Sequence, residues 1–594
     1  MSRSNDWQPA LEQHMDPTMT HLTRWFLAAL FAFWLVPLQA QDRPNILLVL
    51  TDDQGYGDVG VHGNDLIRTP NMDKLSTEGV RMSQFIVNPS CTPTRAALLT
   101  GRDSYRTGVA DVQGMAHLMG SGETTIADLL ANAGYRTGIF GKWHLGDNYP
   151  FRPTDQGFQE ALVHKGGGVG QSAGPAGNTY YDPILDHNDE PKRYEGYVDD
   201  ILAEATMEFI EASAGEPFFA FYSTPLPHFP LDVPDERADP YREMGMHELN
   251  ARTYGMVENI DRNLGRILDK LDELALEENT LVIFMSDNGP RTRRTKNDRY
   301  PDRYVAGLRG TKSSIYENGI RVPFFVRWPG VIPEGRVSNE MAAHIDLLPT
   351  LLDVAGVSAP EELELDGISI LPHLLGEVAE IPDRPIFIQG HRGMTHEPYV
   401  HMAVRTKRYK LISPHDDPYN QNISDYRSPV EWRQMLSSLE LYDILEDPSE
   451  LQNLATSQPD IVEELLATYE DWYAGASQNR DQSDKRVLLG DSEQPIVQLS
   501  RFDPNREKGH HWWVQPREGT YRITLQFPEA SESGEATVRF GSQTHRMAVE
   551  PGNSEVTFEE VPLPNEPGYL EASLTYDRLP QIPHFVNVER TGSR

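Results

Sequence analysis

The stretch Asn45-Ile46-Leu47-Leu48-Val49-Leu50-Thr51-Asp52-Asp53-Gln54-Gly55 joins an unbroken apolar run to a polar cluster. An apolar run without alternation predicts a strand buried on both faces, as in the parallel sheets of α/β proteins. The other apolar runs that lead into polar clusters are Arg136–Phe140 before Gly141-Lys142-Trp143-His144, Phe218–Tyr222 before Pro227-His228, and Leu281–Met285 before Ser286-Asp287-Asn288-Gly289. A fifth strand is predicted at Val322–Arg327, and helical spacing, as in Thr253–Leu274, separates the strands. Because open α/β sheets bind ligands outside the carboxyl ends of their strands, we expect one shared site.

Cys91 is the only cysteine in the 594 residues, and a helix is predicted to begin beside it. Thr92 suits a helix cap, Pro93 suits the first helical position, and Gly101 suits the C-terminal stop. Cys91 would then lie near free backbone N–H groups that favour an anion. We interpret Cys91 as an active-site residue, although a lone cysteine is otherwise an ordinary small core residue.

The composition limits the partners and the source of stability. The formal net charge of −36 argues against nucleic acid and anionic membrane surfaces as partners. An anionic substrate would therefore need a binding site that departs locally from the acidic surface. A single cysteine allows no internal disulfide, so the chain depends on core burial, for which its length is sufficient.

The N-terminus predicts export. Arg24 precedes an apolar run from Trp25 to Leu38, and Gln39-Ala40-Gln41 follows it. This order is typical of a secretory signal, which we place at residues 1–40, and the run is short for a bilayer span. We expect a periplasmic or secreted protein without stable membrane insertion. Because an Ala-x-Ala pattern is missing, a buried N-terminal helix or a membrane anchor is the alternative.

Three folded regions are predicted after the signal. Residues 41–382 form the α/β domain, and residues 383–476 form a smaller α+β subdomain with antiparallel strands at Val404–Ile412 and Glu440–Tyr442 and a helix at Ile461–Ala474. Residues 477–486 form a linker. Residues 487–594 alternate apolar and polar residues between turn signals, which indicates an accessory β-sandwich-like domain. Its His510-His511-Trp512-Trp513 run either stacks on sugar rings or packs inside the protein.

Two polar pairs predict a metal site. Asp52 and Asp53 follow one strand, and Asp287 and Asn288 follow another. All four offer oxygen, which suits Ca²⁺ or Mg²⁺ and disfavours Zn²⁺. Either pair alone is equally consistent with a turn or a helix cap, but two pairs in one α/β domain favour a cation.

A set of cations and imidazoles surrounds the same strand ends. Its members are Arg95, Lys142, His144, His228 and Lys312. Singly, such residues are usually solvated or structurally satisfied. Together with a metal they would neutralise a tetrahedral oxyanion from several sides, which is how charge is stabilised in phosphoryl or sulfuryl transfer.

These residues carry a family resemblance. The chain resembles the type I, formylglycine-dependent sulfatases of the alkaline-phosphatase-like superfamily over about Arg43 to Leu454. The matching motifs, in the family's order, are Thr51–Asp58, Cys91–Arg102 with its CxPxR signature, Gly141–Gly146, Ser286–Gly289 and Gly319–Pro323, followed by Leu441–Ile444 and Asn453-Leu454. The resemblance implies a mostly parallel sheet flanked by helices, followed along the chain by the smaller α+β subdomain. The β-sandwich-like module comes after both.

The resemblance also implies the chemistry. A maturation enzyme would oxidise Cys91 to formylglycine (3-oxoalanine), whose hydrated aldehyde is the nucleophile. Asp52, Asp53, Asp287 and Asn288 would bind one Ca²⁺, with Mg²⁺ less favoured, and the ion would also contact the residue formed from Cys91. The formylglycine explains why a thiol alone does not suffice, because only a geminal diol can expel sulfate by returning to a carbonyl.

Roles for the remaining residues follow from the same resemblance. Arg95 and His144 would position the diol, while Lys142, His228 and Lys312 would bind the sulfate. His228, helped by Lys312, would protonate the leaving alcohol. After one hydroxyl has attacked sulfur, His144 would take the proton of the other. One departure from the family pattern is Glu317-Asn318-Gly319, where Glu-Gly-Gly is common, and it leaves the Lys312 loop less certain.

The densest basic run of this acidic chain lies between Asn288 and Lys312. It contains Arg291, Arg293 and Arg294. Such a run is either a solvated face or a rim that binds further sulfates or carboxylates of a polyanionic glycan. With export and a possible glycan-binding module, it favours a sulfated polysaccharide or oligosaccharide, such as an algal glycan or a glycosaminoglycan.

Two rival functions remain open at this stage. A phosphate or phosphonate ester hydrolase of the same superfamily would use the same CxPxR context. A non-catalytic glycan-binding protein would keep the fold, but the intact Cys91 and metal set argue against it. Turnover of sulfate and phosphate esters of one chromogenic alcohol separates these functions.

Overall fold

The computed structural model describes residues 43–112, 114–171, 173–295, 298–299, 303–390, 398–413, 438–478, 485–501, 503–504, 511–576 and 579–592. The predicted signal at residues 1–40 lies outside this range. Among the described helices, none is long and apolar enough to cross a membrane.

The centre of the fold is a mainly parallel sheet, which confirms the predicted class. In its middle, β8 (Thr280–Ser286), β1 (Asn45–Thr51), β7 (Phe218–Ser223) and β3 (Arg136–Lys142) run side by side and parallel. Within the described residues the sheet has eleven strands, the others being β2 (Val80–Ile86), β4 (Glu160–His164), β5 (Ile184–His187), β6 (Glu190–Arg193), β11 (Arg321–Val322), β12 (Phe324–Arg327) and β13 (Arg336–Ala343). The four predicted strands are thus neighbours, and their carboxyl ends share one edge.

The prediction of one strand at Val322–Arg327 is wrong in one respect. It is divided at Pro323 into β11 and β12, both of which pair antiparallel to their neighbours. Proline has no N–H to donate to a sheet ladder, so it interrupts the strand.

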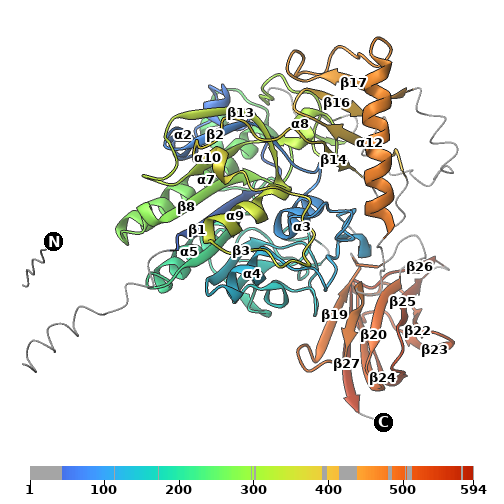
Figure 1. Cartoon of the computed structure of the whole chain (residues 1–594). Helices are drawn as coiled ribbons and strands as arrows, with labels where there is room; N and C mark the ends of the chain where they lie inside the picture. Colours follow the sequence, from blue (N-terminus) through green and yellow to red (C-terminus); the bar gives the residue numbers. More distant parts are fainter. Residues whose placement is uncertain are drawn as a thin grey trace, which may run out of the picture. The chain divides into compact units, whose positions relative to one another are not determined.

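Helices cover both faces of the sheet (Figure 1). One face is covered by α3 (Cys91–Thr100), α4 (Ile126–Asn132) and α9 (Leu347–Ala355), and the other by α2 (Pro70–Thr77), α5 (Val198–Ala212), α6 (Asp235–Glu243) and α7 (Glu248–Glu273). In β1, Ile46, Leu48 and Leu50 pack with the helices of the first face, whereas Leu47 and Val49 pack with those of the second. This burial on both faces explains the unbroken apolar run of β1. Helix α7 begins five residues before the predicted Thr253 start.

A second, antiparallel sheet follows the α/β region. Its order is β14 (Ile386–Gln389), β15 (Met402–Arg405), β16 (Tyr409–Ile412) and β17 (Glu440–Asp443), and α12 (Pro459–Gln478) packs beside it. The single strand predicted at Val404–Ile412 is in fact a hairpin, β15 and β16, in which Thr406 and Tyr409 close the turn through backbone and hydroxyl hydrogen bonds. The segment contains no Gly, Pro, Asn or Asp, so the sequence offered no turn signal that would divide the strand.

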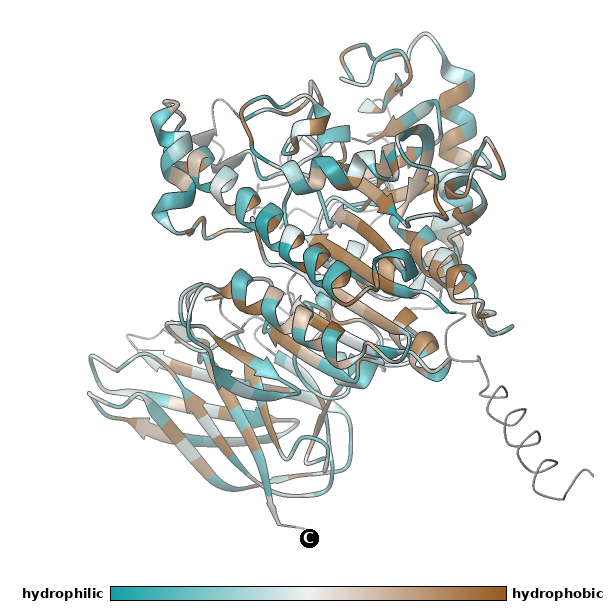
Figure 2. Ribbon diagram, turned by 90° about the vertical axis from the view of Figure 1, so that its left-hand side faces the viewer, coloured by the Kyte–Doolittle hydropathy of each residue, from teal (hydrophilic) through white to brown (hydrophobic). Residues whose placement is uncertain are grey.

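Residues 485–592, here called the C-terminal module, contain two mainly antiparallel sheets. One sheet has β18 (Val487–Leu489), β20 (His511–Pro516), β22 (Gly534–Phe540), β23 (Gln543–Val549), β25 (Gly568–Tyr576) and β26 (Leu579–Gln581), and the other has β19 (Ile496–Ser500), β21 (Gly519–Gln526), β24 (Glu555–Leu563) and β27 (Phe585–Gly592). Figure 2 shows hydrophilic and hydrophobic residues alternating along these strands, whereas the central sheet is mainly hydrophobic. One apolar cluster fills the space between the two sheets.

The aromatic run of the C-terminal module lies in β20. Trp512 is buried in the module core, and its Nε1–H donates to the Ser500 carbonyl at 2.9 Å. Trp513 lies with its ring centroid 4.6 Å from that of Tyr569 on the neighbouring strand. Packing therefore accounts for Trp512, while His510 lies outside the described residues.

A buried ion cluster joins the α/β region to the second sheet. Glu317 of α8 (Glu317–Ile320) accepts hydrogen bonds from Arg405 Nε and Lys410 Nζ, both at 3.1 Å. Lys410 Nζ also lies 2.8 Å from Glu450 Oε1, and the Glu317 N–H donates to Glu450 Oε2 at 2.7 Å. Burial would raise the pKa of Glu317, but the Arg405 and Lys410 charges outweigh it and lower the pKa to about 2.

Replacement of Glu317 should destabilise the protein strongly. Glu317→Gln leaves two buried cations short of one negative charge, so we expect a loss of about 3 kcal/mol or more in the free energy of unfolding. Because the pKa of Glu317 is depressed from 4.5 to about 2, its contribution is present above pH 4.5 and is lost as the pH falls toward 2. Urea unfolding followed by tryptophan fluorescence measures both effects.

The matched control is Lys74→Gln, which breaks the exposed ion pair with Glu78. It should change the unfolding free energy by less than about 1 kcal/mol. Equal urea midpoints for Glu317→Gln and the wild type would contradict the role of the cluster.

Candidate active site

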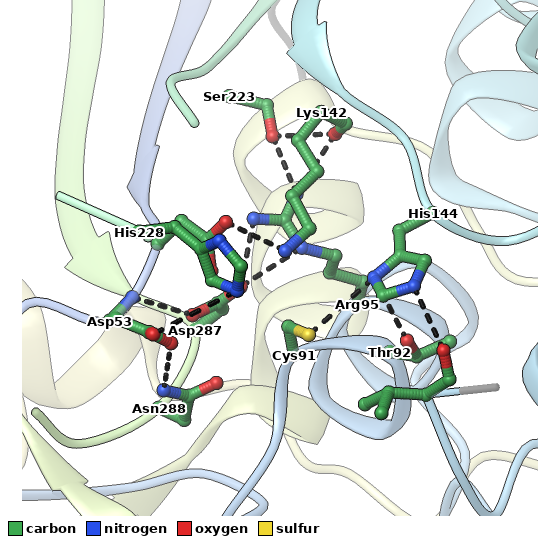
Figure 3. A network of polar contacts seen from close by, with 12 residues as sticks. Asp53, Cys91, Thr92, Arg95, Lys142, His144, Ser223, His228, Asp287 and Asn288 are labelled. Atoms are coloured by element: carbon green, nitrogen blue, oxygen red, sulfur yellow. Dashed lines mark hydrogen bonds and ion pairs between the residues drawn. The ribbon is translucent and has the colours of Figure 1, made fainter. Parts of the chain in front are cut away.

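The predicted polar side chains meet at the shared edge of the sheet (Figure 3). They come from the ends of β1, β3, β7 and β8, from the start of α3, and from the loop at residues 310–314. The residues brought together are Asp52, Asp53, Cys91, Arg95, Lys142, His144, His228, Asp287, Asn288 and Lys312. Every one except Lys312, at the edge of the group, is buried.

The local structure around Cys91 differs from the prediction by one or two residues. Helix α3 begins at Cys91 itself, after Ser90 in extended conformation with φ −150° and ψ 154°. Thr92 is therefore inside the helix, and its hydroxyl is used elsewhere, 3.1 Å from His144 Nδ1. Gly101 ends the helix with φ 65°, as predicted.

His144 faces Cys91 with its Nδ1 atom. This nitrogen lies 3.5 Å from Cys91 Sγ, while Nε2 lies 3.1 Å from the Val112 carbonyl oxygen. A carbonyl only accepts, so Nε2 carries the proton and Nδ1 presents its lone pair. Burial, followed by the nearby Lys142 charge, lowers the pKa of His144 well below its ordinary value. The imidazole is thus neutral and suited to accept a proton at Nδ1.

Each carboxylate of the site is paired with a cation. Lys142 Nζ lies 2.6 Å from Asp52 Oδ2, and Lys312 Nζ pairs with Asp53 Oδ1. Arg95 donates from Nε and Nη2 to Asp287 Oδ2 at 3.0 and 2.8 Å. The three pairs allow three buried carboxylates to stand side by side.

Ser223 is a site residue that the sequence reasoning missed. Arg95 Nη1 donates to Ser223 Oγ at 2.6 Å and to the Lys142 carbonyl at 2.9 Å. Ser223 Oγ in turn donates to that same carbonyl at 2.7 Å. The arginine is therefore fixed to the ends of two strands as well as to Asp287. The signal was the position of Ser223 directly after the predicted strand Phe218–Tyr222.

Oxygen atoms of the four predicted metal ligands are left for a cation. Asp52 Oδ1, Asp53 Oδ2 and Asn288 Oδ1 are buried and have no hydrogen-bond partner among the residues that the structure describes. Asp287 Oδ1 accepts only a long bond of 3.3 Å from the Asp53 N–H among the described contacts. Asp52, Asp287 and Cys91 also offer ligand atoms that lie within 4.8 Å of one another. Unpaired buried oxygens are costly, so this donor set fits a hard divalent cation such as Ca²⁺.

The pKa values of the carboxylates support the same conclusion. Burial, followed by the neighbouring Asp52 charge, raises the pKa of Asp287 to about 6. Burial also raises the pKa of Asp52. Burial acts in the same direction on Asp53, but Lys312 and then His228 outweigh it and hold its pKa well below the usual range. Two of three carboxylates thus resist ionisation, and a bound cation would favour their charged forms.

His228 completes the site on the side of Asp53. Its Nδ1–H donates to the Phe229 carbonyl at 2.7 Å, and its Nε2 lies 3.9 Å from Asp53 Oδ2. Burial, followed by the Lys312 charge, lowers the pKa of His228 to about 3. Nε2 is the atom that remains to contact a ligand.

A glycine run lies against both histidines. A Cβ atom at Gly167 would lie 2.9 Å from His144 Cε1, and one at Gly168 would lie 3.1 Å from His228 Nδ1. Only glycine permits this close approach of the backbone. The Gln171 amide nitrogen would lie 2.9 Å from the same Gly168 Cβ, so this side chain is also beside the site. The run Gly166-Gly167-Gly168 was the unused signal in the sequence.

The Lys312 loop is held by the residue that departs from the family pattern. Asn318 Nδ2 donates to the Gly310 carbonyl at 3.0 Å, and the Lys312 N–H donates to the Pro290 carbonyl at 2.8 Å. The asparagine therefore supports the loop.

The predicted basic run is described only in part. The Arg291 guanidinium lies over the Phe229 ring, 5.4 Å from its centroid, and Phe229 follows His228. Arg293 and Arg294 belong to β9 (Arg293–Thr295), which pairs with β10 (Asp298–Arg299), but their side chains lie outside the described structure. Arg291 is thus next to the site.

Comparison with known proteins matches two sequence families. The family described as "Sulfatase" matches residues 44–357, more than half of the chain. The family described as "N-sulphoglucosamine sulphohydrolase, C-terminal" matches residues 311–471.

Individual relatives show the same likeness. The chain is 33% identical to N-acetylgalactosamine-6-sulfatase of Canis lupus familiaris over 416 residues, which cover 65% of this chain and 75% of the relative. It is 32% identical to human arylsulfatase A over 477 residues, which cover 71% and 86% of the two chains. Among solved structures, Ps i-CgsB in complex with k-i-k-neocarrahexaose matches with a TM-score of 0.63 and 28% identity, over 74% of this chain and 94% of that one.

Ca²⁺ should stabilise the protein through the four oxygen-bearing residues. At a free concentration about a hundredfold above Kd, the ion should add about 2.7 kcal/mol to the unfolding free energy, and a chelator should remove this gain. Asp287→Asn should lose most of the Ca²⁺-dependent rise in Tm. Mg²⁺ should give a smaller rise, because it demands a stricter geometry than this set of side chains offers.

Asp65→Asn is the matched control, because Asp65 is exposed and outside the site. Thermal unfolding with and without each ion checks the prediction. An unchanged Ca²⁺ response in Asp287→Asn would rule out the assigned ligands.

Proposed function

The chain belongs to the sulfatase family, and from this membership we propose that it hydrolyses sulfate esters of a sulfated glycan, using formylglycine formed from Cys91 and a bound Ca²⁺. The single observation that carries the proposal is the constellation at the sheet edge. There the lone cysteine faces a neutral histidine at 3.5 Å, beside buried carboxylate and amide oxygens that have no partner within the described part of the chain.

The formylglycine and the Ca²⁺ of this proposal define the roles of the surrounding side chains. When present, formylglycine supplies a hydrated aldehyde that is nucleophilic toward sulfur, and Ca²⁺ supplies positive charge to the oxygens around it. Asp52, Asp53, Asp287 and Asn288 would hold the ion. The ion would also compensate the carboxylates, so that Lys142 and Lys312 become available to the oxygens of the sulfate.

The two histidines handle protons on opposite sides of the reaction. His144 Nδ1 faces the residue-91 side chain with its lone pair and accepts a proton there. His228 Nε2 lies on the side of Asp53 and Lys312 and gives a proton to the leaving alcohol. In the ligand-free site its pKa is about 3, so sulfate binding must raise that pKa for His228 to act as the acid.

Substrate class is supported by relatives and by charge. One relative is named for a sulfated amino sugar, and the solved structure Ps i-CgsB is bound to a neocarrahexaose. Arg291 beside the site, within a basic run of an acidic chain, suits a substrate with several anionic groups. We therefore propose a sulfated polysaccharide or oligosaccharide.

Export is part of the proposal. The apolar run Trp25–Leu38 supports secretion to the periplasm or the medium, where polymeric glycans are met. Formylglycine formation requires a maturation enzyme as a partner during biosynthesis.

Cys91→Ser should abolish turnover in a host whose maturation system does not oxidise serine. The fold and the Ca²⁺-dependent rise in Tm should be largely kept, because Asp52, Asp53, Asp287 and Asn288 are unchanged and the replaced atom is a single sulfur. Hydrolysis of sulfate and phosphate esters of one chromogenic alcohol, together with peptide mass of the residue-91 segment, measures the effect. Full activity in Cys91→Ser would contradict the assignment of residue 91 as the nucleophile. A preference for the phosphate ester would show that the protein is a phosphatase and not a sulfatase.

Charge reversal of the basic run should affect polymers selectively. Arg291→Glu, and the double change Arg293→Glu with Arg294→Glu, should raise KM about tenfold or more for a sulfated polysaccharide. The kcat/KM for a small aryl sulfate should change less than about threefold. Arg546→Glu, at an exposed ion pair of the C-terminal module, is the control. Equal losses on polymer and aryl sulfate would exclude a polymer-binding rim.

A further inference from the structure

The orientation of His144 depends on a neighbouring loop that contacts the C-terminal module. This positioning loop, residues 107–120, supplies the Val112 carbonyl that accepts the Nε2–H of His144. In its described residues, 107–112 and 114–120, the regular structure is one short turn, η2 (Gly114–His117), and the internal bonds include Ala110 N–H to the Ala116 carbonyl at 3.0 Å. Because this carbonyl selects the tautomer that leaves Nδ1 unprotonated, contacts that fix the loop also fix the state of His144.

The first external support is Lys485 of the C-terminal module. Lys485 is buried, and its Nζ donates to the Gly108 carbonyl and lies 3.5 Å from the Met115 carbonyl. Gly108 has φ +78°, and a Cβ there would lie 2.7 Å from Lys485 Cε. The glycine thus lets the lysine connect the start of the loop at Gly108 with its short turn at Met115.

The second support is Asp503 of the same module. Its Oδ1 lies 3.8 Å from His117 Nε2, and the His117 ring centroid lies 5.9 Å from that of His144. Asp503 is itself fixed, because its Oδ2 accepts from the Ser500 N–H at 3.1 Å and from the Ser500 hydroxyl at 2.9 Å. A rigid carboxylate therefore faces the imidazole that packs beside His144.

Apolar packing ties the module to the same loop. Leu118 of the loop and Phe151 belong to the hydrophobic core of the C-terminal module. Trp513 of β20 packs against Met115 and Ala116. The module therefore shares its core with the loop and cannot be treated as a tethered appendage.

We propose that Lys485 and Asp503 are positioning residues for His144, so that the C-terminal module is a working part of the active site. The inference rests on the proposed function of His144 as the group that accepts a proton from residue 91. Neither Lys485 nor Asp503 touches the reacting atoms. They act through the positioning loop and the Val112 carbonyl.

The test compares Lys485→Met, Lys485→Arg and Asp503→Asn with the wild type in the full chain. On a small aryl sulfate, Lys485→Met and Asp503→Asn should lower kcat about tenfold or more, because a misplaced proton acceptor costs at least that much. KM should not rise, since the residues proposed to bind sulfate do not belong to the loop. Lys485→Arg keeps a buried donor and should recover most of kcat.

Hydrogen exchange supplies a readout that does not need catalysis. In Lys485→Met and Asp503→Asn, amides of residues 107–120 should exchange faster, while β1 and α3 should exchange as in the wild type. Arg522→Gln is the matched control, because its exposed ion pairs with Glu559 and Glu589 lie within the module. It should change neither kcat nor exchange in the loop.

The outcomes separate this inference from the proposed function. If the wild-type protein with converted Cys91 turns over no sulfate ester, the proposed function is wrong. The exchange results would still test whether Lys485 and Asp503 hold the positioning loop. An active wild type with unchanged kcat in Lys485→Met and Asp503→Asn would overturn the inference. Raised KM with unchanged kcat, or global loss of protection, would also overturn it.

Discussion

The structure depends on the electrostatic balance of three carboxylates buried at one edge of the central sheet. Asp52, Asp53 and Asp287 are tolerable there only because Lys142, Lys312 and Arg95 lie within ion-pair distance. Even with these cations, burial keeps the pKa of Asp287 at about 6 and leaves several oxygens unpaired. The remaining imbalance favours a divalent cation, and a cation beside residue 91 is what transfer of an anionic group requires. The same constraint thus supports both the proposed metal site and the proposed chemistry.

Much of this arrangement was predictable because it follows from local pattern and chain direction. Strands that are buried on both faces and parallel must end at one edge, so the polar clusters behind Leu50, Phe140, Tyr222 and Met285 had to meet. Other features arise from contacts between distant segments, which no local pattern encodes. Ser223 joins the site through Arg95, and Lys410 meets Glu317 across 93 positions of sequence. The hairpin inside Val404–Ile412 was missed because its turn contains none of the usual turn residues Gly, Pro, Asn or Asp.

The C-terminal module shows that residues outside the sequence motifs contribute to the arrangement of the site. Its two sheets enclose a core that includes Leu118 and Phe151 from the α/β region. Through Lys485 and Asp503 it contacts the loop whose Val112 carbonyl orients His144. The motif Gly141–Gly146 contains His144, whereas the carbonyl that orients His144 belongs to a segment outside that motif. Gly108 makes the close contact between this loop and Lys485 possible.

The central claim is that turnover belongs to a modified residue 91 and not to its thiol. The most direct measurement produces the protein with graded amounts of maturation enzyme, determines the aldehyde fraction by peptide mass, and measures sulfate release from an aryl sulfate in the presence of Ca²⁺. The account predicts that turnover per molecule rises in proportion to the aldehyde fraction and extrapolates to zero when Cys91 remains a thiol. Substantial turnover in fully unconverted protein would contradict it.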